Sequence, residues 1–144
     1  MDIEINLKFV EDSNYIFNKM IPELTVFGIE KTKTFYIDIL GFKIEYERPE
    51  DKFVFVSYEG SQFMFEEMHE DGWNVGEMKY PLGQGVNFSI EVNDIGELYS
   101  NLVKEGLPFY RDIMVSTYEV NEEDVEQREF IIQDPNGYLL RFTD

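Results

Sequence analysis

The stretch Gly60-Ser61-Gln62-Phe63-Met64-Phe65-Glu66-Glu67 aligns without gaps with Gly137-Tyr138-Leu139-Leu140-Arg141-Phe142-Thr143-Asp144 at the end of the chain. Upstream of each stretch stands a Val-x-x-Ile segment, followed about twelve residues later by a glycine between larger side chains: Val26-x-x-Ile29 before Leu40-Gly41-Phe42, and Val92-x-x-Ile95 before Glu105-Gly106-Leu107. Repeated spacing of this kind indicates a duplicated structural unit. We therefore predict two modules of strand, helix and three strands, at about 20–68 and 85–144, joined by a linker at 69–84.

Local patterns support this order of elements. An apolar stripe over 30–40 predicts a helix that ends at Gly41, and Asp94 is placed to cap a second helix that ends at Gly106. Asp134-Pro135-Asn136-Gly137 has the composition of a tight turn. Runs rich in Val, Ile, Phe and Tyr predict strands at 42–47, 52–58, 61–67, 86–92, 109–118, 127–133 and 138–143.

Residues 1–19 stand outside the repeat. Within them, apolar and polar residues alternate over 3–9, which predicts a half-buried strand that extends a sheet edge or packs across a dimer. The N-terminal sequence has neither a basic leader nor a long apolar run, so we expect a cytoplasmic protein.

Composition excludes several function classes. The 144 residues include 12 basic and 30 acidic groups, a net charge of −18, which disfavours nucleic acid and anionic membranes as partners and would concentrate cations. Cysteine is absent and His69 is the only histidine, so thiolate chemistry and sites built from two or three histidines are excluded.

The duplicated unit and its turn sequences resemble the vicinal oxygen chelate superfamily, which includes glyoxalase I, extradiol dioxygenases, and fosfomycin- and bleomycin-resistance proteins. The resemblance spans about 20–144 and rests on Ile21-Pro-Glu-Leu24, Ile39-Leu-Gly-Phe42, Arg128-Glu-Phe130 and the turn 134–137. It implies an α+β fold in which two tandem βαβββ modules form a curved mixed sheet around a cleft. Glu70-Asp-Gly-Trp73 makes the bleomycin-resistance branch the best likeness, and that branch consists of acidic homodimers that hold a cationic glycopeptide without altering it.

The superfamily's enzymes place one metal ligand on each of four strands. The repeat alignment assigns these positions to Ile21, Met64, Asn87 and Arg141. Isoleucine has no donor atom, arginine offers no lone pair, and thioether sulfur suits soft ions. We therefore expect no metal, no cofactor and no Lewis-acid chemistry.

Strand alternation directs other polar side chains toward the cleft, among them Glu23, Glu66 and Glu91. With Arg141, they predict a polar wall of net negative charge that would accept a cationic ligand. The alternative is that Arg141 only pairs with a glutamate inside a closed barrel.

Two features outside the strands are candidates for the same role. Trp73 in the linker would stack on a flat aromatic or cationic group, or would only cover the core as a lid. The acidic stretch from Glu119 to Glu129 is interpreted as a solvated loop that could also guide a cation toward the cleft.

The sequence thus predicts a metal-independent homodimer that sequesters a small cationic molecule of the bleomycin type. The alternative is a glyoxalase- or dioxygenase-like enzyme that acts on an unknown small metabolite. The expected ligand-binding residues are Glu23, Met64, Glu66, Trp73, Asn87, Glu91 and Arg141.

Overall fold

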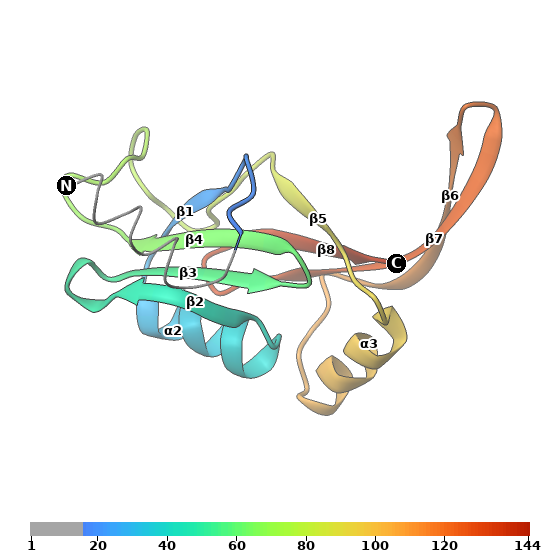
Figure 1. The fold of residues 1–144 in the computed structure, drawn as a ribbon, viewed down its shortest axis with the longest axis horizontal. Coiled ribbons are helices and arrows are strands. Elements are labelled where there is room, and N and C mark those ends of the chain that lie inside the picture. The colour runs from blue at the N-terminus through green and yellow to red at the C-terminus, as the bar shows by residue number, and fades with distance from the viewer. Residues whose placement is uncertain (1–15) are drawn as a thin grey trace.

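The computed structural model describes residues 16–144, which form two four-stranded mixed sheets (Figure 1). The strand orders are β1-β4-β3-β2 and β5-β8-β7-β6, and in each sheet the first two strands listed are parallel and the other neighbours antiparallel. The bounds are β1 (Glu23–Val26), β2 (Lys43–Arg48), β3 (Phe53–Tyr58), β4 (Ser61–Glu67), β5 (Asn87–Glu91), β6 (Arg111–Val120), β7 (Glu123–Gln133) and β8 (Leu139–Thr143). The predicted α+β class with two like modules is confirmed, whereas the strand predicted at 3–9 lies outside the described residues.

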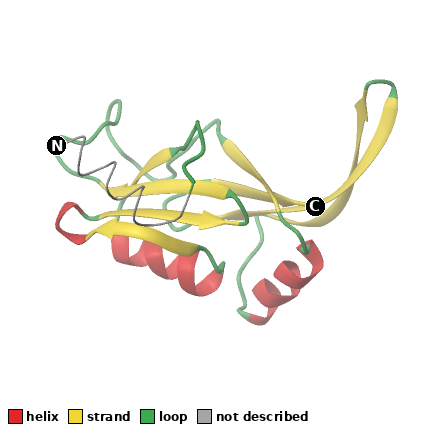
Figure 2. Cartoon of the chain, viewed as in Figure 1, coloured by secondary structure: helices red, strands yellow, loops and turns green. Residues whose placement is uncertain are grey.

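One helix accompanies each sheet, and both helices lie on the same side of the two sheets (Figure 2). The first begins as α2 (Ile29–Lys33) and continues as a π-helical segment (Thr34–Ile39) before Gly41, whose φ is +91°. The second is α3 (Ile95–Lys104), where the Glu97 N–H donates a 3.0 Å hydrogen bond to Asp94 Oδ1 as a cap. A short 3₁₀ turn (Pro49–Asp51) links β2 to β3.

A single apolar core lies between the helices and the sheets and runs through both modules. Alternate residues of β4 and β8 enter it, namely Phe63 and Phe65 from β4, and Leu140 and Phe142 from β8. Phe63 meets Phe88 of β5 edge to face at 5.1 Å, which joins the two halves of the core. Because one face of each strand is buried here, Met64 and Arg141 lie on the opposite, open face of their sheets.

The strands β6 and β7 extend well beyond the second sheet and form a projecting arm, residues 114–128 (Figure 1). The partner strand β8 pairs with β7 only from Glu129 to Gln133, so the arm is a two-stranded ribbon. Asn121 and Glu122 form its tip, and their φ values of +51° and +68° suit the tight turn of a hairpin. The interpretation of 119–129 as a loop is therefore wrong outside the two-residue tip, because its other residues belong to the strands β6 and β7.

No helix within residues 16–144 is both long enough and apolar enough to cross a bilayer.

Candidate functional site

Strand register in the two sheets reproduces the internal repeat. In the first sheet Met64 of β4 pairs with Glu23 of β1, and in the second Arg141 of β8 pairs with Ser89 of β5. Ile21 and Asn87 stand two residues before these partners in the chain. Met64 and Arg141 are therefore structurally equivalent, and the open faces of the two sheets can be compared position by position.

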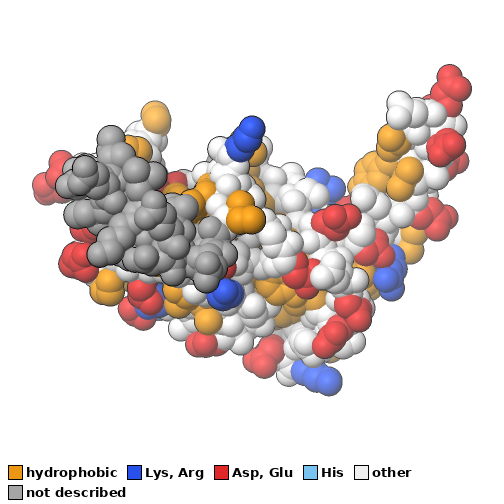
Figure 3. Space-filling view, viewed as in Figure 1, with side chains coloured by type: hydrophobic (Ala, Val, Ile, Leu, Met, Phe, Trp, Pro, Cys, Tyr) orange, Lys and Arg blue, Asp and Glu red, His pale blue; other side chains and the backbone are white. Residues whose placement is uncertain are grey.

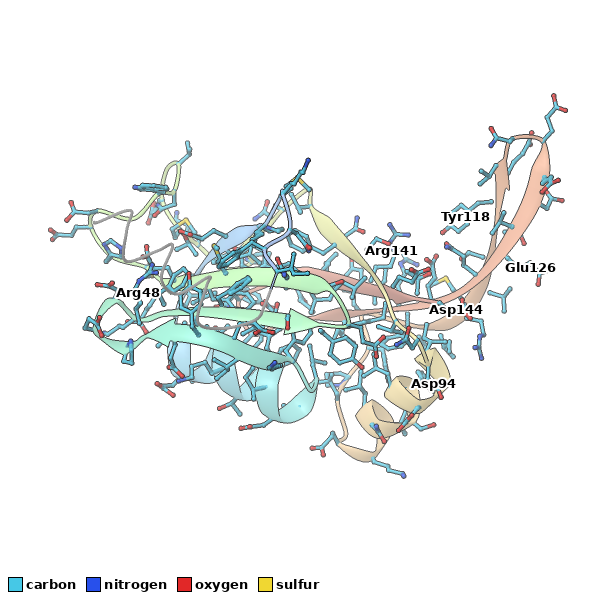
Figure 4. The ribbon with its side chains drawn as sticks, in the orientation of Figure 1. Arg48, Asp94, Tyr118, Glu126, Arg141 and Asp144 are labelled. Atoms are coloured by element: carbon cyan, nitrogen blue, oxygen red, sulfur yellow. The ribbon has the colours of Figure 1, made fainter. Side chains whose placement is uncertain are left out.

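The open face of the second sheet carries a connected polar cluster centred on Arg141. Its Nε donates to Asn87 Oδ1 at 3.1 Å, and its Nη1 lies 3.3 Å from Glu129 Oε2. Ser116 Oγ and the Tyr118 hydroxyl both donate to Glu129 Oε1, at 2.8 and 2.7 Å. In Figure 4 the Tyr118 side chain lies on the side of the arm that faces Arg141. Residues of β6 and β8 thus converge on the carboxylate of Glu129 in β7, and Asn87 of β5 joins the cluster through Arg141.

Glu129 is 5% exposed, and its environment determines its charge. Burial by itself raises the pKa of this carboxyl, but the hydrogen bonds from Tyr118, Ser116 and Arg141 outweigh burial, so the pKa is lowered. An ionised Glu129 fixes the guanidinium and neutralises its charge. Because both of its oxygens already accept hydrogen bonds, Glu129 is suited to positioning Arg141 rather than to removing a proton from a ligand.

A hollow of about 570 Å³ adjoins this cluster at the start of β5 and β8. Asn87, Leu139 and Gln133 line it from the sheet, and Tyr110 and the 81–86 loop close its sides. Asn87 belongs to both the hollow and the polar cluster, so a small molecule seated there would lie beside the Arg141 guanidinium.

The open face of the first sheet is acidic. Thr25 of β1 pairs with Glu66, which brings Glu66 close to Glu23 on the same face. Burial and the charge of Glu66 raise the pKa of Glu23, while Arg48 acts in the opposite direction. His69 Nε2 lies 2.9 Å from Glu66 Oε1, so the histidine expected on an exposed loop contacts this wall. The face can therefore attract a cation, although its own Arg48 and His69 compete for the carboxylates.

The structure separates some of the predicted ligand-binding residues. It brings together Glu23, Met64 and Glu66 on the first sheet, and Asn87 and Arg141 on the second. Glu91 is exposed at the far end of β5. Trp73 is 92% exposed at the tip of the linker, so it does not cover the core as a lid, and within this chain it does not join either cluster.

The patterns in the sequence did not indicate Glu129, Ser116 and Tyr118 as members of this cluster. Glu129 was counted in an acidic loop, although Phe130 and Ile132 on either side of Ile131 form a buried alternating pair. That alternation places Glu129 and Ile131 together on the open face. Arg141 does pair with a glutamate, as the alternative for this residue supposed, but the pair lies on an open sheet face rather than inside a closed barrel.

A divalent metal does not fit the four equivalent positions. The only oxygen donor among them is the Asn87 amide, and its Oδ1 already accepts from the Arg141 guanidinium. Across residues 16–144, no three His, Cys, Asp or Glu side chains are grouped in a way that could hold a metal ion. A metal ion at Asn87 would have to displace the Arg141 guanidinium from the Asn87 oxygen.

Comparison with known proteins agrees with this architecture. The chain is 27% identical over 130 residues to bleomycin resistance proteins from Geobacillus stearothermophilus and Staphylococcus aureus, covering 85% of this chain and 92% of each relative. Among solved structures, a glyoxalase/bleomycin resistance protein/dioxygenase from Alicyclobacillus acidocaldarius matches with a TM-score of 0.62 at 24% identity, over 92% of both chains. A virulence protein from Salmonella typhimurium matches with a TM-score of 0.66 at 17% identity, over 90% of this chain and 98% of that one.

The two solved structures show the shared fold only, because their sequence identities are low. The model of the Glyoxalase/Bleomycin resistance protein/Dioxygenase superfamily, by contrast, matches residues 20–142, which includes both modules and the linker. The chain therefore belongs to the Glyoxalase/Bleomycin resistance protein/Dioxygenase superfamily.

Proposed function

We propose that the protein binds a small cationic molecule of the bleomycin type and sequesters it without metal chemistry. The observation that carries this proposal is that the four positions equivalent to the superfamily's metal ligands hold a set of side chains that cannot bind a catalytic metal. Among them, Arg141 is held by its contacts with Glu129 and Asn87. The curated relatives that match 85% of the chain are named bleomycin resistance proteins, which supports the same ligand class.

Electrostatics favours a cation in spite of Arg141. The positive charge of Arg141 is balanced by the buried Glu129, whereas Glu23 and Glu66 on the first sheet add two further carboxylates. The net charge of −18 attracts cations from a distance. An amide- and hydroxyl-rich drug would also find hydrogen-bond partners at Asn87 and the outer edge of the guanidinium.

Calorimetry with metal-free bleomycin tests the proposal. We expect 1:1 binding per chain that weakens as salt is raised, because exposed charges are screened over about 10 Å at 0.1 M salt. Arg141→Met should weaken binding, whereas Lys104→Met, a charge change at the end of α3, should leave it unchanged. Absence of detectable heat at low salt and high concentration would reject the sequestration function.

We further propose that the functional unit is a homodimer in the cytoplasm. The sheet faces opposite the helices lie on one side of the molecule (Figure 2), and a second copy placed over the Arg141 cluster would turn the open face of the second sheet into a cleft. The arm also exposes Val115, Val120 and Val125, and Figure 3 shows hydrophobic side chains along one side of the arm with acidic ones toward its tip and outer edge. Two-stranded ribbons are marginally stable alone, so a dimer contact along the arm would stabilise it. Sedimentation at tens of micromolar should give a dimer, and a monomer would contradict this part of the proposal.

A further inference from the structure

The open face of the first sheet contains two phenylalanines that are buried without belonging to the core. Phe53 and Phe55 of β3 are 3% and 0% exposed, yet the core between helices and sheets takes their neighbours Val54 and Val56 instead. Strand alternation thus puts both rings on the face that in the second sheet is open to solvent. Something on the open face must cover these rings.

Residues 16–18, here called the strap, supply part of that cover. The Phe17 ring stacks on Phe55 with 5.0 Å between centroids and 26° between planes, and it meets Tyr46 edge-on at 6.4 Å. The guanidinium of Arg48 lies 3.9 Å over the ring of Phe53 beside this stack. We call the surface formed by Tyr46, Phe53 and Phe55 the aromatic seat.

Hydrogen bonds hold the strap at Ile16 and Asn18, the residues on either side of Phe17. The Asn18 backbone N–H donates to Gln62 Oε1 at 2.8 Å, and Asn18 Nδ2 donates to the Gly60 carbonyl at 2.9 Å. Gln62 Nε2 donates in turn to the Ile16 carbonyl. Ile16 is 82% exposed, so the strap adds only the Phe17 ring to the apolar surface it covers.

The seat lies at the position equivalent to the Arg141 cluster. Phe55 pairs with Met64 across β3 and β4, just as Ile131 pairs with Arg141 across β7 and β8. In the second sheet the Arg141 side chain remains 30% exposed. In the first sheet the ring of Phe17 lies over Phe55, the cross-strand partner of Met64. The two halves of the repeat therefore differ in access: one site is open and the other carries an aromatic side chain of the same chain.

We propose that Phe17 is a built-in occupant of the aromatic seat, and that a planar aromatic ligand, favoured when cationic, binds there by displacing the strap. A flat ring can reproduce the stack on Phe55, and Glu23 and Glu66 at the edge of the face favour positive charge. Only molecules with an uncovered seat can bind the ligand. The apparent affinity is therefore the intrinsic affinity multiplied by the fraction of molecules in which the seat is uncovered. This proposal does not require bleomycin to be the ligand.

Titration with proflavine, a planar tricyclic cation, tests the competition. Fluorescence should report binding to the full chain, and Phe17→Ala should tighten it by at least about two- to tenfold, the factor that corresponds to the stack of Phe17 on Phe55 alone. Ile16→Ala is the matched control within the strap, because the Ile16 side chain is 82% exposed and does not cover the seat, and this variant should bind as the wild type does. Asn18→Ala, which loosens the strap without removing its ring, should shift the affinity in the same direction as Phe17→Ala and serves if that variant does not fold.

Amide exchange provides the direct readout of displacement. Saturating proflavine should accelerate exchange at Asn18, whose N–H is bound to Gln62 in the covered state. Equal affinities for the wild type and for the folded Phe17→Ala and Asn18→Ala variants would overturn the proposal. So would proflavine binding that leaves exchange at 16–18 unchanged, or no binding by any variant.

Discussion

The Tyr36 hydroxyl donates a 2.8 Å hydrogen bond to Asp134 Oδ2, which joins the helix of the first module to the turn before the last strand of the second. Both residues are buried. Asp134 Oδ1 also accepts the backbone N–H groups of Asn136 and Tyr138, at 2.8 and 2.9 Å, and Asn136 Oδ1 accepts from the Phe27 N–H at 2.9 Å. The turn of the second module is thus built around contacts to the first, and it fixes how the two modules meet.

Tyr36→Phe should destabilise the fold by about 1–3 kcal/mol, because it removes a buried donor and leaves Asp134 with one partner fewer. Chemical denaturation gives the free energy of unfolding for this comparison. Tyr110→Phe is the control, since Tyr110 is 55% exposed, and it should change stability by less than about 0.5 kcal/mol. Equal effects of the two substitutions would show that the Tyr36–Asp134 bond does not stabilise the module contact.

Asp134 should make stability decrease with rising pH. Burial raises its pKa even though Tyr36 and the turn N–H groups stabilise the charged form. A raised carboxyl pKa means that the contribution is fully present below the ordinary value of 3.8 and is lost as pH rises through the folded-state pKa. Asp134→Asn removes this titration, so its stability relative to the wild type should improve as the pH rises from below 3.8 through the folded-state pKa of Asp134. A relative loss over the same interval would contradict the assigned direction.

Glu129 should behave in the opposite way. Although burial raises its pKa, hydrogen bonds from Tyr118, Ser116 and Arg141 lower it below the ordinary 4.5. Its contribution is therefore present above pH 4.5 and is lost as pH falls through the folded-state pKa. Glu129→Gln should be less stable than the wild type at neutral pH, and the difference should shrink toward acid. Glu126→Gln, on the exposed part of the arm, is the matched control for the loss of one carboxylate from β7.

The sequence repeat predicted the sheet registers because one face of each strand is buried, and a shift by one residue would expose Phe65 or Phe142. The Asp94 cap and the Asp134–Gly137 turn were likewise predictable, since both depend on local hydrogen bonds and backbone angles. The outer part of the arm, 119–126, was not, because its ladder is stabilised without a continuous buried face and its glutamates resemble those of a loop. The partner of Arg141 and the occupant of the aromatic seat depend on contacts between distant segments, which a pattern along one strand does not encode.

Purified protein should carry no stoichiometric Zn²⁺, Ni²⁺, Fe²⁺ or Mn²⁺. The reason is chemical: Ile21 and Arg141 cannot ligate, Met64 suits soft ions, and the Asn87 oxygen is already bound to Arg141. Elemental analysis after dialysis is the measurement. A double substitution that places carboxylates at Met64 and Arg141 is the informative comparison, because a gain of metal there would show that the fold retains the geometry. One equivalent of metal on the wild-type chain would refute the prediction.

Trp73→Ala should weaken bleomycin binding by about 1–2 kcal/mol if a cation or a flat ring of the drug stacks on the indole. Trp73 is 92% exposed at the tip of the linker, so the substitution should leave the free energy of unfolding nearly unchanged, and calorimetry can then be interpreted without a folding correction. Val75→Ala is the matched control, because Val75 is fully exposed two residues away and offers no π-face. Since Trp73 is the only tryptophan, its fluorescence gives a second measurement on the wild type. Drug binding that leaves both the fluorescence and the Trp73→Ala affinity unchanged would keep the binding function and remove Trp73 from the site.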